Sequence, residues 1–251
     1  MSEQEHASLG IDGVETPFPD SPFVVMKFGG RSVATAENWA SIAQLIRQRI
    51  DEGTIPVVVH SALAGISNEL EELLGKATSG DVAAELRAIH EQHERLAADL
   101  GVDPLLLEPE FQNLQQLIEG VRLVGEVSPR VHARVMATGE LAATTLSVAY
   151  LQRQGLPARW QDARELLQSE TQRDQTERSG ILAASCDFAP TAELQAELSD
   201  TNGFILTQGF IARSDSGETV LLGRGGSDTS GAYLAVKLQA RRLEIWTDVP
   251  G

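Results

Sequence analysis

The chain has few cations, and this shortage limits the ligands that it can bind. Its 251 residues include 20 Lys and Arg against 36 Asp and Glu, which gives a formal net charge of -16. Only three of the cations are lysines, namely Lys27, Lys76 and Lys237. Nucleic acids are held by clustered lysine and arginine, so the composition argues against a nucleic-acid partner. An anionic ligand would have to be held by a few well-placed cations and by backbone N–H groups.

Cysteine and long hydrophobic runs are also scarce. The single cysteine, Cys186, excludes a disulfide within the chain and favours a cytoplasmic protein, and we expect it to be a small buried apolar residue. No uncharged run reaches the roughly 20 residues that a membrane-spanning helix needs, so no membrane partner is expected. Residues 1–21 have neither the basic nor the apolar segment of a signal peptide and are predicted to form a flexible leader.

The longest nearly apolar stretch contains one carboxylate. The stretch VMATGELAATTLSVAYL, residues 135–151, includes Glu140. The pattern predicts a helix buried in protein, and a carboxylate in such a helix needs a partner. From the residues alone, a core or interface carboxylate is the favoured interpretation of Glu140, and a binding role is the alternative.

The hydrophobic pattern predicts a single α/β domain with a helical insertion. An apolar strand at 23–28 leads into a helix that Thr35 can cap, and a second apolar strand follows at 55–60, which is the βαβ unit of a parallel sheet. Helical patterns dominate residues 66–155. The later predicted elements are a short edge strand within 155–162, strands at 203–212 and 218–223, a helix at 227–242 and a strand at 243–249.

The histidines predict no metal site. His60, His90, His93 and His132 show no spacing that is typical of metal ligands. His90 and His93 share one face of a predicted helix, and with Glu91 and Glu94 beside them we expect that face to be solvated.

Two glycine-rich segments each lead from an apolar strand into a helix. The first is FVVMKFGGRSVATAEN (23–38) and the second is LLGRGGSDTSGAYLA (221–235). Glycines let a backbone approach a ligand closely, and the free N–H groups at a helix start favour an anion such as phosphate. The alternative is that the glycines serve the turn geometry alone. No P-loop pattern is present, and Asp228 stands at the third glycine position of a dinucleotide fingerprint, which makes that interpretation the weaker one.

Two cations accompany these glycines. Lys27 ends the first strand, where it can either reach water or hold a phosphate. Arg224 precedes a helix start, where the macrodipole opposes a cation, so a bound anion would explain its presence. Asp228 lies in the first turn of the same helix and has two candidate roles, helix capping and catalysis.

Together these segments resemble the aspartate kinases of the amino acid kinase superfamily. Lys27 to Gly30, followed by Ser32 and Val33, is similar to the opening lysine-glycine motif of that family. The further matching motifs, in the order of the family, are SALAGISN (61–68), TGEL (138–141), TQGFIA (207–212), LGRGGSD (222–228) and WTDVPG (246–251). The match runs from about residue 23 to the end of the chain, and motifs in the right order are a far more specific signal than any single one.

The resemblance implies a fold and an activity. The fold is a three-layer α/β/α sandwich with a parallel-rich central sheet. The activity uses ATP and Mg²⁺ to phosphorylate the side-chain carboxylate of L-aspartate, giving 4-phospho-L-aspartate on the way to lysine, threonine and methionine. The full-length enzyme is expected to be a homo-oligomer.

The resemblance also implies roles for individual residues. Lys27 would contact the transferring phosphoryl group, and Asp228 would orient the reacting groups. Glu140 would take the substrate ammonium group, and Arg224 its α-carboxylate. The other implied site residues are Ser61, Ser67 and Phe210 around the amino acid, and Gly29, Gly30, Gly225, Gly226, Ser227, Thr247 and Asp248, with Lys27, around ATP.

The chain departs from the family pattern in three places. Arg31 and Ser67 each stand where the family commonly has threonine. The chain ends at WTDVPG, whereas the family continues through further nucleotide-binding residues and regulatory domains. We therefore expect residues 22–251 to be a C-terminally truncated catalytic domain of a longer enzyme, inactive by itself, and a fused second activity stays open. The rival functions are a glutamate, acetylglutamate or nucleotide kinase of the same superfamily, and a non-catalytic amino-acid-binding module.

Overall fold

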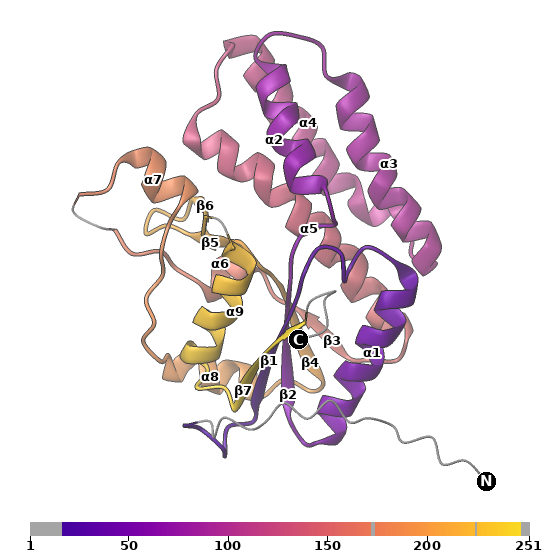
Figure 1. Cartoon of the computed structure of the whole chain (residues 1–251), viewed down its shortest axis with the longest axis vertical. Helices are drawn as coiled ribbons and strands as arrows, with labels where there is room; N and C mark the ends of the chain where they lie inside the picture. Colours follow the sequence, from indigo (N-terminus) through magenta and orange to yellow (C-terminus); the bar gives the residue numbers. More distant parts are fainter. Residues whose placement is uncertain (1–16, 172–173, 224, 247–251) are drawn as a thin grey trace, which may run out of the picture.

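The computed structural model describes residues 17–171, 174–223 and 225–246. Within these residues a five-stranded sheet has the order β3-β4-β2-β1-β7 with all neighbours parallel, and helices cover both of its faces (Figure 1). The strands are β1 (Phe23–Phe28), β2 (Ile55–His60), β3 (Ala158–Trp160), β4 (Phe204–Gln208) and β7 (Arg242–Trp246). β5 (Ile211–Arg213) and β6 (Thr219–Leu221) form a separate antiparallel pair. The predicted three-layer α/β/α fold with a parallel sheet is confirmed.

The helices follow the predicted order, with additional short ones. Thr35 is the N-cap of α1 and accepts a hydrogen bond from the Asn38 backbone N–H, as its position predicts. The described helices are α1 (Ala36–Asp51), α2 (Ile66–Ala77), α3 (Ala83–Leu100), α4 (Glu108–Val124), α5 (Pro129–Arg153), α6 (Ala163–Leu166), α7 (Glu177–Leu182), α8 (Ala192–Ser199) and α9 (Gly226–Lys237), with a 3₁₀ turn at Pro104–Leu107.

Alternate residues of the central strands enter two separate cores. Met26 and Val58 pack with α1 and with the helical layer α2 to α5 on one face of the sheet. Val25 and Val57 pack with α8 and α9 on the other face. Successive side chains of a strand point to opposite faces, so a strand that is covered on both sides must be apolar throughout. This requirement explains the continuous apolar runs in the sequence.

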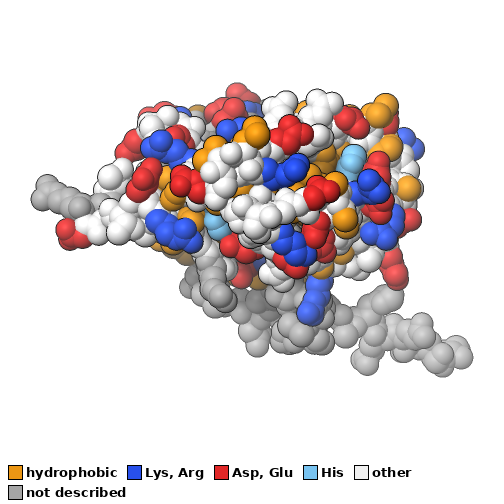
Figure 2. All heavy atoms as spheres, turned by 90° about the horizontal axis from the view of Figure 1, so that it is seen from above, with side chains coloured by type: hydrophobic (Ala, Val, Ile, Leu, Met, Phe, Trp, Pro, Cys, Tyr) orange, Lys and Arg blue, Asp and Glu red, His pale blue; other side chains and the backbone are white. Residues whose placement is uncertain are grey.

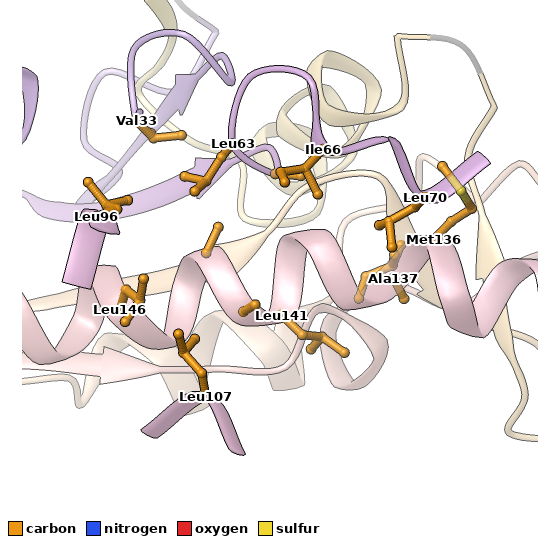
Figure 3. Close-up of a cluster of buried hydrophobic side chains, with 14 of the residues drawn as sticks. Val33, Leu63, Ile66, Leu70, Leu96, Leu107, Met136, Ala137, Leu141 and Leu146 are labelled. Atoms are coloured by element: carbon orange, nitrogen blue, oxygen red, sulfur yellow. The ribbon is translucent and has the colours of Figure 1, made fainter. Parts of the chain in front are cut away.

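Helix α5 is the centre of the helical layer. Figure 3 shows Leu63, Ile66 and Leu70 packed along one side of α5, and Leu107 on another side. A helix that is covered on several sides is hydrophobic around most of its circumference, which explains its long apolar sequence. The predicted buried helix over residues 135–151 is therefore confirmed.

Three further details bear on the predictions. Cys186 is buried, as expected, and burial raises the pKa of its thiol to about 11. The predicted helix at 227–242 is too long, because α9 ends at Lys237 and Arg242 begins β7. The expectation that His93 is solvated is wrong, since its side chain is fully buried and lies edge-on to Phe111, with ring centroids 5.4 Å apart.

The face of the molecule in Figure 2 carries charged side chains of both signs. Acidic and basic side chains are intermingled on this face, with hydrophobic atoms between them. Among the helices that the structure describes, none is long and apolar enough to cross a lipid bilayer.

Candidate active site

A cavity of about 290 Å³ opens where the two glycine segments meet. It lies beyond the carboxyl ends of β1, β2 and β4, the edge at which open parallel sheets bind their ligands. The N-terminus of α9 forms another wall. The lining residues are Lys27, Ser61, Ser67, Glu140, Phe210, Gly223, Gly225, Gly226, Ser227 and Asp228. All of these except Gly223 are site residues that the sequence predicts.

Lys27 forms an ion pair inside this cavity. Its Nζ atom lies 2.6 Å from Asp228 Oδ1, and its side chain is 9% exposed against 54% for Asp228. The alternative in which Lys27 simply reaches water is therefore wrong. A buried ammonium group needs an anion, and Asp228 supplies one from the first turn of α9, where the helix dipole also favours a carboxylate.

Two glycines, which have no side chain, allow the start of α9 to pack against the turn after β4. A Cβ atom on Gly226 would lie 2.6 Å from Phe210 Cδ2, and one on Gly209 would lie 2.6 Å from Ser227 Cβ. Phe210 itself has a φ of 69°, a left-handed conformation that is uncommon outside glycine, and its N–H donates to Ser230 Oγ at 2.9 Å. These contacts fix the position of Phe210 beside the helix N-terminus.

Glu140 is a buried carboxylate with incomplete hydrogen bonding. The residue is 2% exposed, and its Oε1 atom accepts a hydrogen bond from the Ala62 N–H at 3.3 Å. Oε2 has no hydrogen-bond partner among the described residues. Burial raises the pKa of Glu140 to about 8. A cationic ligand group in the cavity would supply the missing partner and stabilise the ionised form.

Gly139 allows α5 to approach the segment that follows β2. A Cβ atom at this position would lie 2.9 Å from Ala62 Cβ and 3.0 Å from Ile66 Cγ2. No side chain can be inserted there without moving one backbone away from the other. The glycine next to Glu140 thus brings its carboxylate within reach of the Ala62 N–H.

The remaining predicted residues are placed differently. Gly29 and Gly30 do not line the cavity, and a Cβ atom on Gly30 would lie 2.7 Å from the Ala62 carbonyl oxygen. Gly30 therefore has a packing reason to be glycine, and its contact with phosphate stays a prediction. Arg224, Thr247 and Asp248 lie outside the described residues.

The structure reveals buried polar residues beside the cavity that the sequence did not predict as site residues. His60, the last residue of β2, is fully buried and contacts both the Ser61 carbonyl oxygen and Ser147 Oγ of α5. Gln208, at the end of β4, donates to Thr144 Oγ1 of α5 at 2.8 Å. The available signal was a polar residue at the end of each apolar strand, but the partners in α5 are visible only in three dimensions.

The fold and the site define a class of protein. An open parallel sheet that carries a lysine and a glycine-flanked helix N-terminus at its carboxyl edge is typical of α/β proteins that bind small anionic ligands. The chain belongs to the amino acid kinase family, whose model matches residues 22–251.

Curated relatives and solved structures are consistent with that family. The chain is 36% identical to "Aspartokinase 3, chloroplastic" of Arabidopsis thaliana over 90% of its length, and 34% identical to "Lysine-sensitive aspartokinase 3" of Escherichia coli over 92%. These matches span 41% and 50% of the two relatives, so the chain spans about half their length.

The structural comparison leads to the same group. A crystal structure of E. coli aspartokinase III in complex with aspartate and ADP superposes with a TM-score of 0.74 and 33% identity. It covers 91% of this chain, while this chain covers 50% of that one. A second structure of the same enzyme, with lysine and aspartate, gives a TM-score of 0.77 and 35% identity.

Proposed function

We propose that this chain is the amino-acid-binding part of an aspartate kinase, which transfers the γ-phosphoryl group of ATP to the side-chain carboxylate of L-aspartate. The observation that supports this most directly is the shared cavity of Lys27 and Glu140, in which one buried carboxylate oxygen has no hydrogen-bond partner among the described residues. The aspartokinase relatives and the aspartate named in the two E. coli structures support the same choice.

Glu140 is the proposed anchor of the substrate ammonium group. A free amino acid brings a cation to Oε2, which has no partner in the described part of the chain, whereas an N-acylated substrate brings none. Ser61, Ser67 and Phe210 line the same cavity and would surround the substrate. Arg224 would pair with the α-carboxylate, an assignment that rests on the sequence because the residue lies outside the described structure.

Lys27 and Asp228 are proposed to act at the reacting end. The nucleophile is a carboxylate that is already ionised at neutral pH, so no strong general base is needed. A carboxylate oxygen bonds to the γ-phosphorus while the bond to the β–γ bridging oxygen breaks, and ADP keeps that electron pair. Lys27 would neutralise the charge on the transferring phosphoryl group. Asp228 lies 2.6 Å from the Lys27 ammonium group and would hold that ammonium group in place.

The residues present fit a Mg²⁺–nucleotide substrate. The N-terminus of α9 offers backbone N–H groups from Ser227 onward, since that of Gly226 already donates to the Gly223 carbonyl oxygen at 3.0 Å, and Lys27 offers a cation. Bound Mg²⁺ would neutralise phosphate charge. The described residues contain no group of three or more acidic, histidine or cysteine side chains that could hold a metal ion.

Product trapping distinguishes this proposal from its rivals. An acyl phosphate reacts with hydroxylamine to give a hydroxamate, so Mg-ATP and hydroxylamine are incubated with the full-length protein and with aspartate, glutamate or N-acetylglutamate. We expect a hydroxamate from aspartate. Preferential turnover of glutamate or N-acetylglutamate would favour the other kinases of the superfamily. A protein that binds neither aspartate nor Mg-ATP in calorimetry would be a non-catalytic module.

Two further expectations belong to the same proposal. We propose that the full-length enzyme is a homo-oligomer and that it acts in the cytoplasm. The first follows from the family resemblance and the second from the single cysteine, Cys186. Size-exclusion chromatography with light scattering tests the first.

A further inference from the structure

One peptide group beside the cavity is held on both sides by buried side chains. The carbonyl oxygen of Ser61 lies 2.8 Å from His60 Nδ1, and the N–H of the same peptide unit, that of Ala62, donates to Glu140 Oε1 at 3.3 Å. His60 and Glu140 are 0% and 2% exposed. The imidazole and the carboxylate are therefore linked through a single rigid peptide plane.

The hydrogen bonds of His60 determine its tautomer. A carbonyl oxygen can only accept, so Nδ1 must carry a proton. Burial lowers the pKa of His60 to about 4, which makes the ring neutral at pH 7 and leaves Nε2 as an acceptor. Ser147 Oγ lies 2.9 Å from Nε2 and can donate to it, although the Ala143 carbonyl oxygen, 2.6 Å away, competes for the same hydroxyl proton.

His60 also ties the end of β2 to α5 at a second point. Glu140 and Ser147 are seven residues apart on α5, a spacing that places both on one face of a helix. Ser147 contacts the His60 ring, and Glu140 contacts the peptide that this ring holds. The Trp39 ring packs edge-on against the imidazole, with centroids 5.4 Å apart, and restricts its rotation.

We propose that His60 is a positioning residue for substrate binding. By holding the Ser61 carbonyl, it directs the Ala62 N–H to Oε1 of Glu140, which leaves Oε2 as the oxygen that receives the ammonium group of the amino-acid substrate. This inference rests on the proposed function for the identity of the ligand. His60 itself touches neither substrate nor nucleotide in this role.

Two isosteric variants separate positioning from simple packing. In His60→Asn the amide nitrogen takes the place of Nδ1 and can still donate to Ser61, whereas in His60→Gln the amide reaches the place of Nε2 and the bond to Ser61 is lost. The affinity of L-aspartate is measured by calorimetry in the 251-residue chain. We expect His60→Asn to stay within about threefold of the wild type and His60→Gln to bind about tenfold more weakly or worse, as for a loss of 1.4 kcal/mol.

His93→Gln is the matched control. His93 is also fully buried, and its Nδ1 lies 2.9 Å from the Ile89 carbonyl oxygen, but it does not line the cavity. We expect this variant to lose stability without losing aspartate affinity. Equal aspartate affinities in His60→Gln and the wild type would overturn the positioning role, as would equal losses in His60→Asn and His60→Gln.

A measurement on the wild type keeps the proposal testable if the variants do not fold. The ¹⁵N chemical shifts of the imidazole nitrogens report which of them is protonated, and we expect Nδ1–H for His60. Protonation at Nε2 would contradict the proposal. If the wild-type chain shows this tautomer but does not bind aspartate, the proposed substrate is wrong while the His60 geometry stands, so the two failures are distinguishable.

Discussion

Lys27 at the end of β1 and Asp228 in the first turn of α9 form an ion pair of 2.6 Å across the candidate active site. Gly231 lies where α9 packs on the sheet, and a Cβ atom there would be 3.4 Å from Lys27 Cβ and 3.3 Å from Leu243 Cδ1. The close approach of α9 to the sheet therefore brings both predicted catalytic residues together. A phosphoryl group entering the cavity would contact an ammonium that is already oriented.

The first prediction concerns the role of Lys27 in the chemical step. Replacing it with alanine in the full-length protein should lower kcat by about 100-fold or more, while the affinity for aspartate changes by less than about threefold, because the lysine is expected to act on the transferring phosphate. Steady-state kinetics and calorimetry measure the two quantities. Lys76→Ala is the control, since Lys76 pairs with Glu72 and Glu85 on the surface. Equal losses in turnover and affinity would assign Lys27 to substrate recognition instead.

The second prediction concerns stability and pH. The pKa of Glu140 is raised from 4.5 to about 8 by burial, so between these values the folded protein holds a proton that the unfolded chain has released. The stability contributed by this proton is fully present below pH 4.5 and is lost as the pH rises through about 8. Between pH 4.5 and about 8, the unfolding free energy of the wild type should therefore fall by a few kcal/mol relative to that of Glu140→Gln, whose side chain does not titrate.

Urea unfolding of both proteins across this pH range measures that difference. His60 and His93, whose pKa values burial lowers to about 4, make stability rise with pH up to about 6.5, but they do so equally in both proteins and cancel in the comparison. A constant difference between wild type and Glu140→Gln would show that Glu140 does not titrate anomalously.

The third prediction tests the close packing beside Glu140. In Gly139→Ala the new methyl group would meet Ala62 Cβ at 2.9 Å and push α5 away from the segment after β2. We expect a loss of about 1–3 kcal/mol in unfolding free energy, together with weaker aspartate binding, since the Ala62 N–H would no longer reach Oε1. Thermal unfolding and calorimetry measure the two effects.

Gly75→Ala is the matched control for this change. Gly75 is also within a helix, α2, but a Cβ atom there would meet nothing within 4 Å. Alanine should therefore stabilise that helix by up to about 1 kcal/mol. If both substitutions were stabilising, the contact between Gly139 and Ala62 would not be the constraint that the geometry indicates.

Much of the fold was predictable because burial on both faces of a sheet leaves a direct signal in the sequence. The apolar runs at 23–28 and 55–60 are β1 and β2 with their predicted bounds. The end of α9 was not predictable from periodicity, since Gln239, with a φ of 48°, reverses the chain before β7. The prediction for His93 was wrong because it was based on the neighbouring charges of Glu91 and Glu94. Those charges do not indicate that Phe111 of α4 packs on the imidazole.

The site was predictable to the extent that it depends on residue types in order along the chain. The family resemblance predicted that Lys27, Glu140 and Asp228 belong to one site, and the structure places all three around one cavity. The Lys27–Asp228 ion pair and the hold of His60 on the Ser61 carbonyl depend on contacts between distant segments. No local pattern encodes such contacts, so only the three-dimensional arrangement reveals them.

A calorimetric comparison of L-aspartate with succinate tests the central claim most directly. Succinate carries the same two carboxylates but no ammonium group, so its binding reports what Glu140 contributes. We expect succinate to bind at least about tenfold more weakly than L-aspartate to the wild type, and the two affinities to converge in Glu140→Gln. Equal affinities of both ligands for the wild type would contradict the assignment of Glu140 as the ammonium site.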